Sequence, residues 1–221
     1  PALSAQITWG DSIQIDTVGG SNITLSYSPM GDLRVFHNMP DGATDRLYSV
    51  KRSFGTSVFG NYNQVISRGR EMDVFYQSED TLIVGLSRGT NIQVRQSNNG
   101  GISWSLTKSY AASNTFWEDY NPVAMTKDNG EFRLFHGYIY DDGFFGGQNK
   151  FWNAKTTNGT WDATSSYFAN GQIKADKIYE KGDTVLLTTN NGPYFSDNDG
   201  ITYSLGLVWT QDTDQTATGR I

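Results

Sequence analysis

The 221-residue chain contains no cysteine, and only two of its residues are histidine. Disulfide bonds, thiolate catalysis and cysteine-ligated zinc are therefore excluded. We accordingly expect neither a metal ion nor another cofactor.

Long apolar runs and basic clusters are also missing. No run approaches the roughly 20 residues that span a bilayer, and no basic-then-apolar leader opens the sequence. The 17 lysines and arginines are scattered among 23 acidic residues, giving a net charge of −6. We therefore expect no nucleic-acid partner and no membrane insertion. The expected location is a virion, the cytosol, or outside the cell by a non-classical route.

Proline is scarce, at five residues, whereas glycine (24 residues) and aromatic residues (14%) are plentiful. Valine, isoleucine, threonine, tyrosine and phenylalanine form short runs between glycine, asparagine, aspartate and serine. No amphipathic stretch at helical spacing exceeds about ten residues. This pattern predicts an all-β domain.

One strand pattern recurs every 50 residues or so. Short apolar strands begin at Leu33, Leu82, Phe132 and Val185, and each follows an acidic or glycine-rich turn preceded by another strand. Such turns suit tight hairpins. Four antiparallel strands repeated at this interval are typical of β-propeller blades. A jelly roll or β-sandwich is the alternative, but it has no reason to repeat at a fixed period.

We therefore predict a single domain, 1–221, that forms a small β-propeller of four-stranded antiparallel blades. The repeats span approximately 21–70, 71–120, 121–172 and 173–209. The remaining segments, 1–20 and 210–221, are expected to act as closing strands. Pairing of these two ends in a split blade favours five blades over four.

Two turns match position by position between the third and fourth strands of their repeats. Both follow the pattern Ser-x-Asn-x-Gly-Ile-(Ser/Thr)-aromatic. The asparagine side chain can accept bonds from nearby backbone N–H groups, and the glycine supplies an unusual backbone conformation. The aromatic residue can pack between sheets. The predicted structural residues are Ser97, Asn99, Gly101 and Trp104, and Ser196, Asn198, Gly200 and Tyr203.

This pattern resembles the Asp-box (BNR) repeat of the sialidase-like β-propeller superfamily, which reads Ser-x-Asp-x-Gly-x-Thr-Trp. Asn99 and Asn198 stand where that family has aspartate, and Thr156–Trp161 resembles a shortened third copy. The resemblance implies that the boxes are structural and lie away from the catalytic face. They therefore point to the fold and not to any particular chemistry.

The enzymes of that family use three arginines, a Tyr–Glu pair and an acidic residue. Arg34 and Arg133 occupy equivalent strands and Arg220 lies near the end, but the family's Arg-Ile/Leu-Pro motif is absent. A general glycosidase needs two suitably spaced carboxylates, which acidic loop residues such as Glu118 and Asp119 could supply. We favour a protein without catalytic residues, with a sialidase-like glycoside hydrolase as the alternative.

The 137–150 segment is the best candidate for ligand contact, because it combines four aromatic residues with two acids and four glycines. Sugar sites pair aromatic faces with polar groups. A satellite core or an oligomer interface would explain the same composition. The predicted ligand-binding residues are Tyr138, Tyr140, Asp141, Asp142, Phe144, Phe145 and Trp117, together with Arg34 and Arg133.

A non-catalytic carbohydrate- or receptor-binding module is the simplest function for these features. It corresponds either to a small propeller lectin or to the receptor-binding part of a phage tail fibre. The expected partner is a glycan or a cell-surface receptor. If the chain is part of a tail fibre, we also expect it to form a homo-oligomer. A purely structural virion module is a further alternative.

Overall fold

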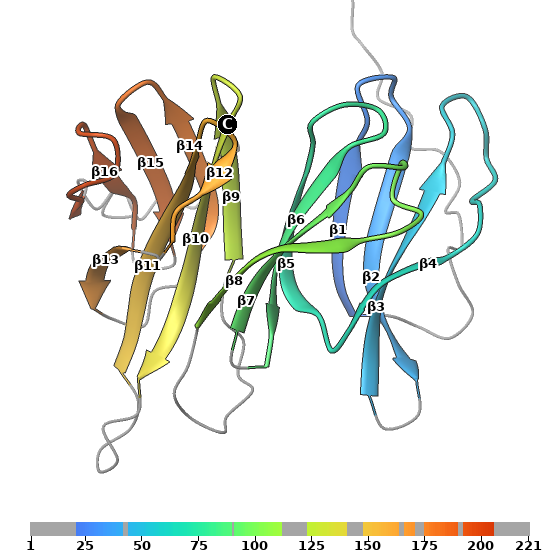
Figure 1. Ribbon diagram of the computed structural model, residues 1–221, viewed down its shortest axis with the longest axis horizontal. Helices are drawn as coiled ribbons and strands as arrows, with labels where there is room; N and C mark the ends of the chain where they lie inside the picture. Colours follow the sequence, from blue (N-terminus) through green and yellow to red (C-terminus); the bar gives the residue numbers. More distant parts are fainter. Residues whose placement is uncertain are drawn as a thin grey trace, which may run out of the picture.

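A computed structural model describes residues 21–41, 44–89, 91–111, 123–140, 148–163, 166–170, 175–189 and 192–205 (Figure 1). All regular structure in these ranges is β-strand. The described part contains no helix that is long and apolar enough to cross a membrane. The prediction of an all-β chain is therefore confirmed.

The strands form four antiparallel sheets, each a meander in sequence order. Blade 1 contains β1 (Ser21–Tyr27), β2 (Leu33–Asp41), β3 (Thr44–Arg52) and β4 (Asn63–Ser67). Blade 2 contains β5 (Arg70–Tyr76), β6 (Leu82–Arg88), β7 (Asn91–Ser97) and β8 (Ser105–Ala111). Blade 3 contains β9 (Val123–Asp128), β10 (Glu131–Tyr140), β11 (Gln148–Thr157), β12 (Thr160–Trp161) and β13 (Ser166–Asn170), with β12 and β13 both paired to β11. Blade 4 contains β14 (Ala175–Lys181), β15 (Thr184–Thr189), β16 (Tyr194–Ser196) and β17 (Ser204–Leu205).

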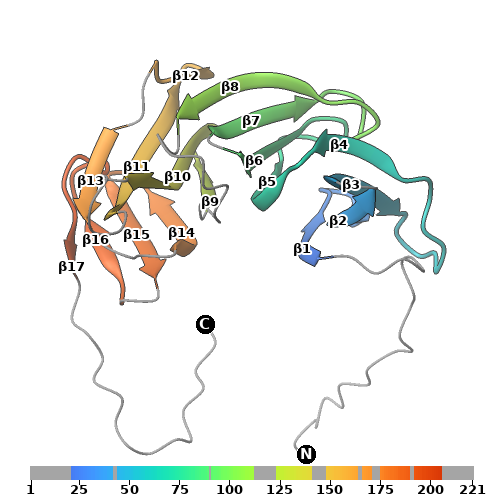
Figure 2. The ribbon, with the colours of Figure 1, turned by 90° about the horizontal axis from the view of Figure 1, so that it is seen from below.

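The four sheets stand side by side around an arc (Figure 2). The first strand of each blade lies innermost, and consecutive first strands contact one another, β1 with β5, β5 with β9 and β9 with β14. This radial stacking of four-stranded meanders defines a β-propeller, with four blades in the described residues. The predicted closing strands, 1–20 and 210–221, lie outside those residues.

Apolar side chains between neighbouring sheets hold the blades together. Phe36 and Leu47 of blade 1 pack with Met72, Val74 and other residues of blade 2. Two further clusters join blade 2 to blade 3 and blade 3 to blade 4. Each blade thus buries a face that a lone sheet would expose to water.

The strand pairings place equivalent residues in equivalent positions. Leu33, Leu82 and Val185 each face the last or second-last residue of their blade's first strand, and Phe132 does so in blade 3. The next residues along the chain, Arg34, Ile83, Arg133 and Leu186, therefore correspond to one another.

The meander also divides the connections between two ends of the propeller. The β2–β3, β6–β7, β10–β11 and β15–β16 turns lie at one end, with the links between blades; we call this the loop end. The hairpins that follow the first and third strands lie at the other end, which we call the turn end. The long β10–β11 hairpin projects at the loop end (Figure 1).

Candidate functional site

The two predicted box turns, 97–104 and 196–203, share one hydrogen-bond pattern at the turn end. Asn99 Oδ1 accepts the backbone N–H of Ser103 at 2.9 Å, and the Gly101 N–H donates to Ser97 Oγ at 2.8 Å. The second turn repeats these bonds at 3.0 and 2.9 Å.

The asparagine amide also donates a bond to a hydroxyl oxygen, whereas an aspartate in the same place would accept one from that hydroxyl. Asn99 Nδ2 donates to Ser103 Oγ at 2.9 Å, and Asn198 Nδ2 donates to Thr202 Oγ1 at 2.8 Å. Because an amide both accepts and donates, asparagine suits this turn chemically.

Arg34 joins the first box turn to the preceding blade. Its guanidinium donates to Tyr76 Oη at 3.2 Å, to Ser49 Oγ at 3.1 Å and to the carbonyl oxygen of Gly100. Two residues along β2, Phe36 meets the Trp104 ring edge-on at 5.9 Å. A buried cation of blade 1, 2% exposed, therefore fastens the turn of blade 2.

Arg133 plays the same part between blades 3 and 4. Its guanidinium, in a residue 1% exposed, donates to Glu180 Oε1 at 2.8 Å and to Asp199 Oδ1. Burial alone would raise the pKa of the Asp199 carboxyl, but Lys155 and Arg133 together bring it below its ordinary value. The difference from Arg34 is that Arg133 has acidic partners.

The junction between blades 2 and 3 lacks this arrangement. Ile83 occupies the position of the arginines and packs in an apolar cluster with Phe132 and Trp161. The 156–161 turn is held instead by the Glu131 carboxylate, which accepts bonds from Thr156 Oγ1 and, at 3.3 Å, from the Gly159 N–H. These bonds, the one from Thr156 foremost, lower the pKa of Glu131.

The predicted ligand loop lies at the opposite, loop end. Tyr138 and Tyr140 belong to β10, where they pair with Lys150 and Gln148 of β11. The other predicted contacts, Asp141, Asp142, Phe144, Phe145 and Trp117, lie outside the described residues. The two hairpin strands, ten residues each, are the longest described strands.

Arg34 and Arg133 are not at this end. The sequence grouped them with the loop as ligand contacts, but the structure places both at blade junctions near the turn end, with partners inside the molecule. A direct ligand contact would require these bonds to break. Ligand binding by either arginine stays a prediction that their observed contacts do not favour.

Asp73 is a residue that the sequence reasoning missed. It lies on the innermost strand β5, accepts the backbone N–H of Met125 at 3.0 Å, and so links blade 2 to blade 3. Burial raises the pKa of its carboxyl. The available signal was one acid within the otherwise uncharged run Met72–Tyr76.

Comparison with known proteins supports the fold alone. No family model matches the sequence, and no curated protein matches it. A Hadza microbial sialidase shares the architecture with a TM-score of 0.61 at 10% identity, over 85% of this chain and 46% of that one. A GH43 β-xylosidase/α-arabinofuranosidase from a compost microbial metagenome gives 0.53 at 9% identity, over 85% and 77%. The polysaccharide lyase Uly1 gives 0.53 at 9% identity, over 88% and 50%.

This chain therefore spans about half the length of the sialidase and of the lyase. The fold similarity extends to several carbohydrate-active propellers with different reactions, and it confirms the predicted β-propeller class.

Proposed function

We propose that the protein is a carbohydrate-binding propeller of sialidase-like descent that holds its ligand at the loop end of blade 3 without catalysis. The observation that carries this proposal is the β10–β11 hairpin. Its ladder continues to the Tyr140–Gln148 pair and presents a loop rich in aromatic and acidic residues. Such residues suit sugar rings and hydroxyl groups.

The two box turns support the descent. Their shared bonds involving Ser97, Asn99 and Gly101, and their counterparts in blade 4, are what the Asp-box resemblance leads us to expect. The structural neighbours named as a sialidase, a glycosidase and a lyase all act on carbohydrates, which supports the ligand class.

The arginine contacts support a non-catalytic role. A sialidase-like carboxylate clamp needs several arginines that reach the ligand. Arg34 and Arg133, two of the three arginines considered for it, are buried and bonded between blades. Glycoside hydrolysis is the alternative, and its candidate acid is Asp73, the carboxyl on the innermost strand β5 beside blade 3.

A glycan array tests the proposal, followed by affinity measurements on the best glycan. Tyr140→Ala combined with Phe144→Ala should weaken binding about ten-fold, because each ring contact with a sugar contributes around a kcal/mol. Phe54→Ala combined with Val58→Ala removes two exposed apolar side chains at the turn end and should leave binding unchanged.

Two outcomes would overturn the proposal. One is an array with no glycan bound above background. The other is turnover of a fluorogenic glycoside that Asp73→Asn abolishes, which would establish the hydrolase instead. A loss of thermal stability in the loop variant, without weaker binding, would identify these rings as packing residues. A glycan borne on a host-cell receptor would extend the proposal to a receptor-binding module, and light scattering would report whether the module is a homo-oligomer.

A further inference from the structure

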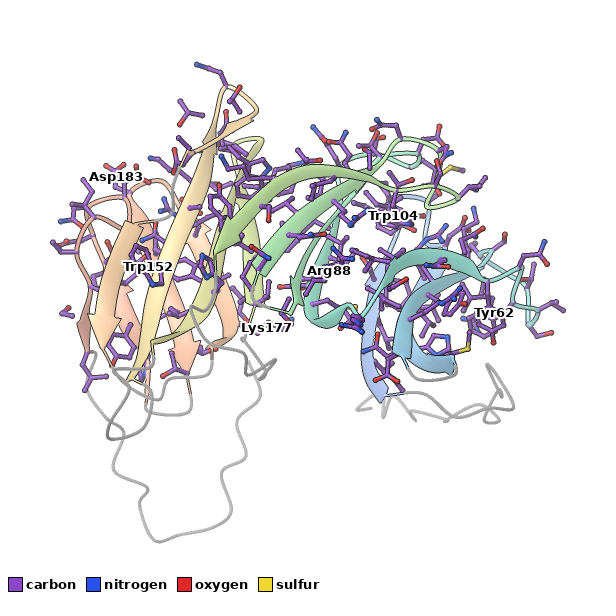
Figure 3. All side chains as sticks on the ribbon, turned by 60° about the horizontal axis from the view of Figure 1, so that its bottom comes forward. Tyr62, Arg88, Trp104, Trp152, Lys177 and Asp183 are labelled. Carbon is purple, nitrogen blue, oxygen red and sulfur yellow. The ribbon has the colours of Figure 1, made fainter. Side chains whose placement is uncertain are left out.

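Two arginines lie on one face of blade 2, close to blade 1. Arg88 ends β6 and pairs with Asn91, whereas Arg95 belongs to β7 and pairs with Val84. Strand alternation places both side chains on the face from which Val84 and Leu86 pack against blade 1. Arg88 lies where this face approaches β4 of blade 1 (Figure 3).

Among the described residues, both guanidinium groups donate to neutral oxygens. Arg88 Nε donates to the carbonyl oxygen of Ser67 at 3.2 Å. Arg95 Nε donates to Gln93 Oε1 at 3.2 Å, so its side chain leans toward the strand end where Arg88 lies. Within the described residues, neither arginine forms an ion pair.

The two positive charges act on each other. Burial, and then the charge of Arg88, lowers the pKa of Arg95. The chain has a net charge of −6, yet it places no described acid against this pair, whereas Arg133 has two. An anion supplied from outside would remove the repulsion between the two cations.

Arg88 lies at the end of the molecule where we expect the ligand, and the side chain of Arg95 points toward that end. The Ser67–Arg70 link between blades and the β6–β7 turn both belong to the loop end, together with the β10–β11 hairpin. Arg68, an exposed residue, directly follows the Ser67 carbonyl that Arg88 contacts. Arg68 and Arg88 thus bring two basic residues to the loop end where blade 1 meets blade 2.

We propose that Arg88 and Arg95 bind an anionic group, a carboxylate or a sulfate, on the saccharide that the loop end recognises. The guanidinium fork matches both groups, because each presents two or more oxygens for paired N–H donors. This inference rests on the proposed carbohydrate-binding function and narrows its ligand class to acidic saccharides.

Three polymers test it on the full chain: dextran, dextran sulfate and polygalacturonate. We expect the protein to bind at least one of the two charged polymers more tightly than dextran. The Arg88→Gln/Arg95→Gln variant should lose about ten-fold or more in affinity, since hydrogen bonds to charged groups contribute about 1.5–3 kcal/mol. Binding should also weaken as salt is added.

The matched control is Arg52→Gln/Lys181→Gln, which removes the same charge at the turn end. It should stay within about two-fold of the unmodified protein, and melting curves would verify that both variants are folded. Binding to dextran sulfate alone or to polygalacturonate alone would support the inference and identify the anion.

Equal loss in the control variant would overturn the inference, since attraction would then be non-specific. So would no preference for either charged polymer, or an unchanged affinity in the Arg88/Arg95 variant. Neutral glycans bound on the array, with sensitivity to the Tyr140/Phe144 change, would in that case leave the proposed function intact. Failure of the proposed function would appear separately, as an array without any bound glycan.

Discussion

The junction between blades 2 and 3 differs chemically from the junctions on either side of it. Arg34 and Arg133 reach from one blade into an asparagine-held turn of the next. Ile83 occupies the same strand position but packs in an apolar cluster beside a turn that Glu131 holds. The three equivalent interfaces between sheets are thus of two chemical kinds, one held by a buried arginine and one by apolar packing.

The difference extends to neighbouring positions. Phe36 and Phe135 meet the box aromatics Trp104 and Tyr203 edge-on, whereas their counterpart in blade 2 is Gly85. A Cβ atom at Gly85 would come within 2.5 Å of Met125 Sδ, so blade 3 fills that space from its own side. The arginine, the phenylalanine and the box turn therefore occur together at two junctions. At the junction between blades 2 and 3, all three are replaced.

Removing the buried cation should have the largest effect on stability. Arg133→Met keeps much of the apolar stem but leaves Glu180 and Asp199 without their shared partner. We expect the free energy of unfolding to fall by about 4 kcal/mol, as for other broken buried ion pairs. Urea or guanidinium denaturation would measure it.

Arg34→Met is the matched comparison, because the hydrogen-bond partners of Arg34 in the described residues are all neutral. We expect a smaller loss, about 2 kcal/mol, from unsatisfied oxygens. Equal losses in the two variants would show that the acids beside Arg133 add nothing, and the distinction between the charged junctions would fail.

The box glycines should give the next largest effect. Gly200 has φ +72°, and an added Cβ would lie 2.7 Å from Tyr203 Oη and 2.5 Å from Arg133 Nη1. Gly159, in the glutamate-held turn, has a similar φ of +73° but open space around it. We expect Gly200→Ala to cost about 3 kcal/mol through backbone strain plus overpacking.

Gly159→Ala isolates the backbone contribution and should cost about 1 kcal/mol. Melting temperatures of the two variants, measured side by side, would compare them. Similar shifts in melting temperature would mean that Gly200 is needed only for the backbone conformation of the turn. The close approach of Arg133 would then not depend on the absence of a side chain there.

Much of the fold could be predicted because the repeat consists of short-range sequence patterns, namely tight turns followed by short apolar strands. Leu33, Leu82, Phe132 and Val185 begin strands as expected, since short apolar runs after tight turns favour hairpins whatever surrounds them. The box turns could be found for the same reason. Ser97, Asn99 and Gly101 make their bonds within a few residues of sequence.

The partners of the arginines could not be predicted in this way. Arg34 contacts Gly100 across 66 positions, and strand alternation does not reveal which blade a side chain faces. A buried arginine and a ligand-binding arginine have the same local sequence. The single acid of β5, Asp73, likewise acquires its partner Met125 only when blades stack. Non-local packing thus decides which polar residues support the fold and which remain available for a ligand.

The smallest expected effect on stability is at the two ends of the arc, where a blade has no described neighbour on one side. Leu25 of blade 1 is 56% exposed, although its counterpart Val74 in blade 2 is 7% exposed against the preceding blade. Ile23 and Tyr27, which flank Leu25 on the same face, are more than half exposed as well. At the other end, Leu186 occupies the arginine position of blade 4, so an apolar junction is expected there. We propose that segments 1–20 and 210–221 supply the strands that close these faces.

Leu25→Ser tests this closure against Val74→Ser. Burial of Val74 in a formed junction predicts a loss of about 3 kcal/mol for its replacement by a hydroxyl side chain. A face covered by the two short terminal segments should lose less, about 1 kcal/mol at Leu25. No change at Leu25 would mean that the face is open to solvent. A loss that appears only at high protein concentration would mean that a second copy of the chain covers it, because only association between chains depends on concentration.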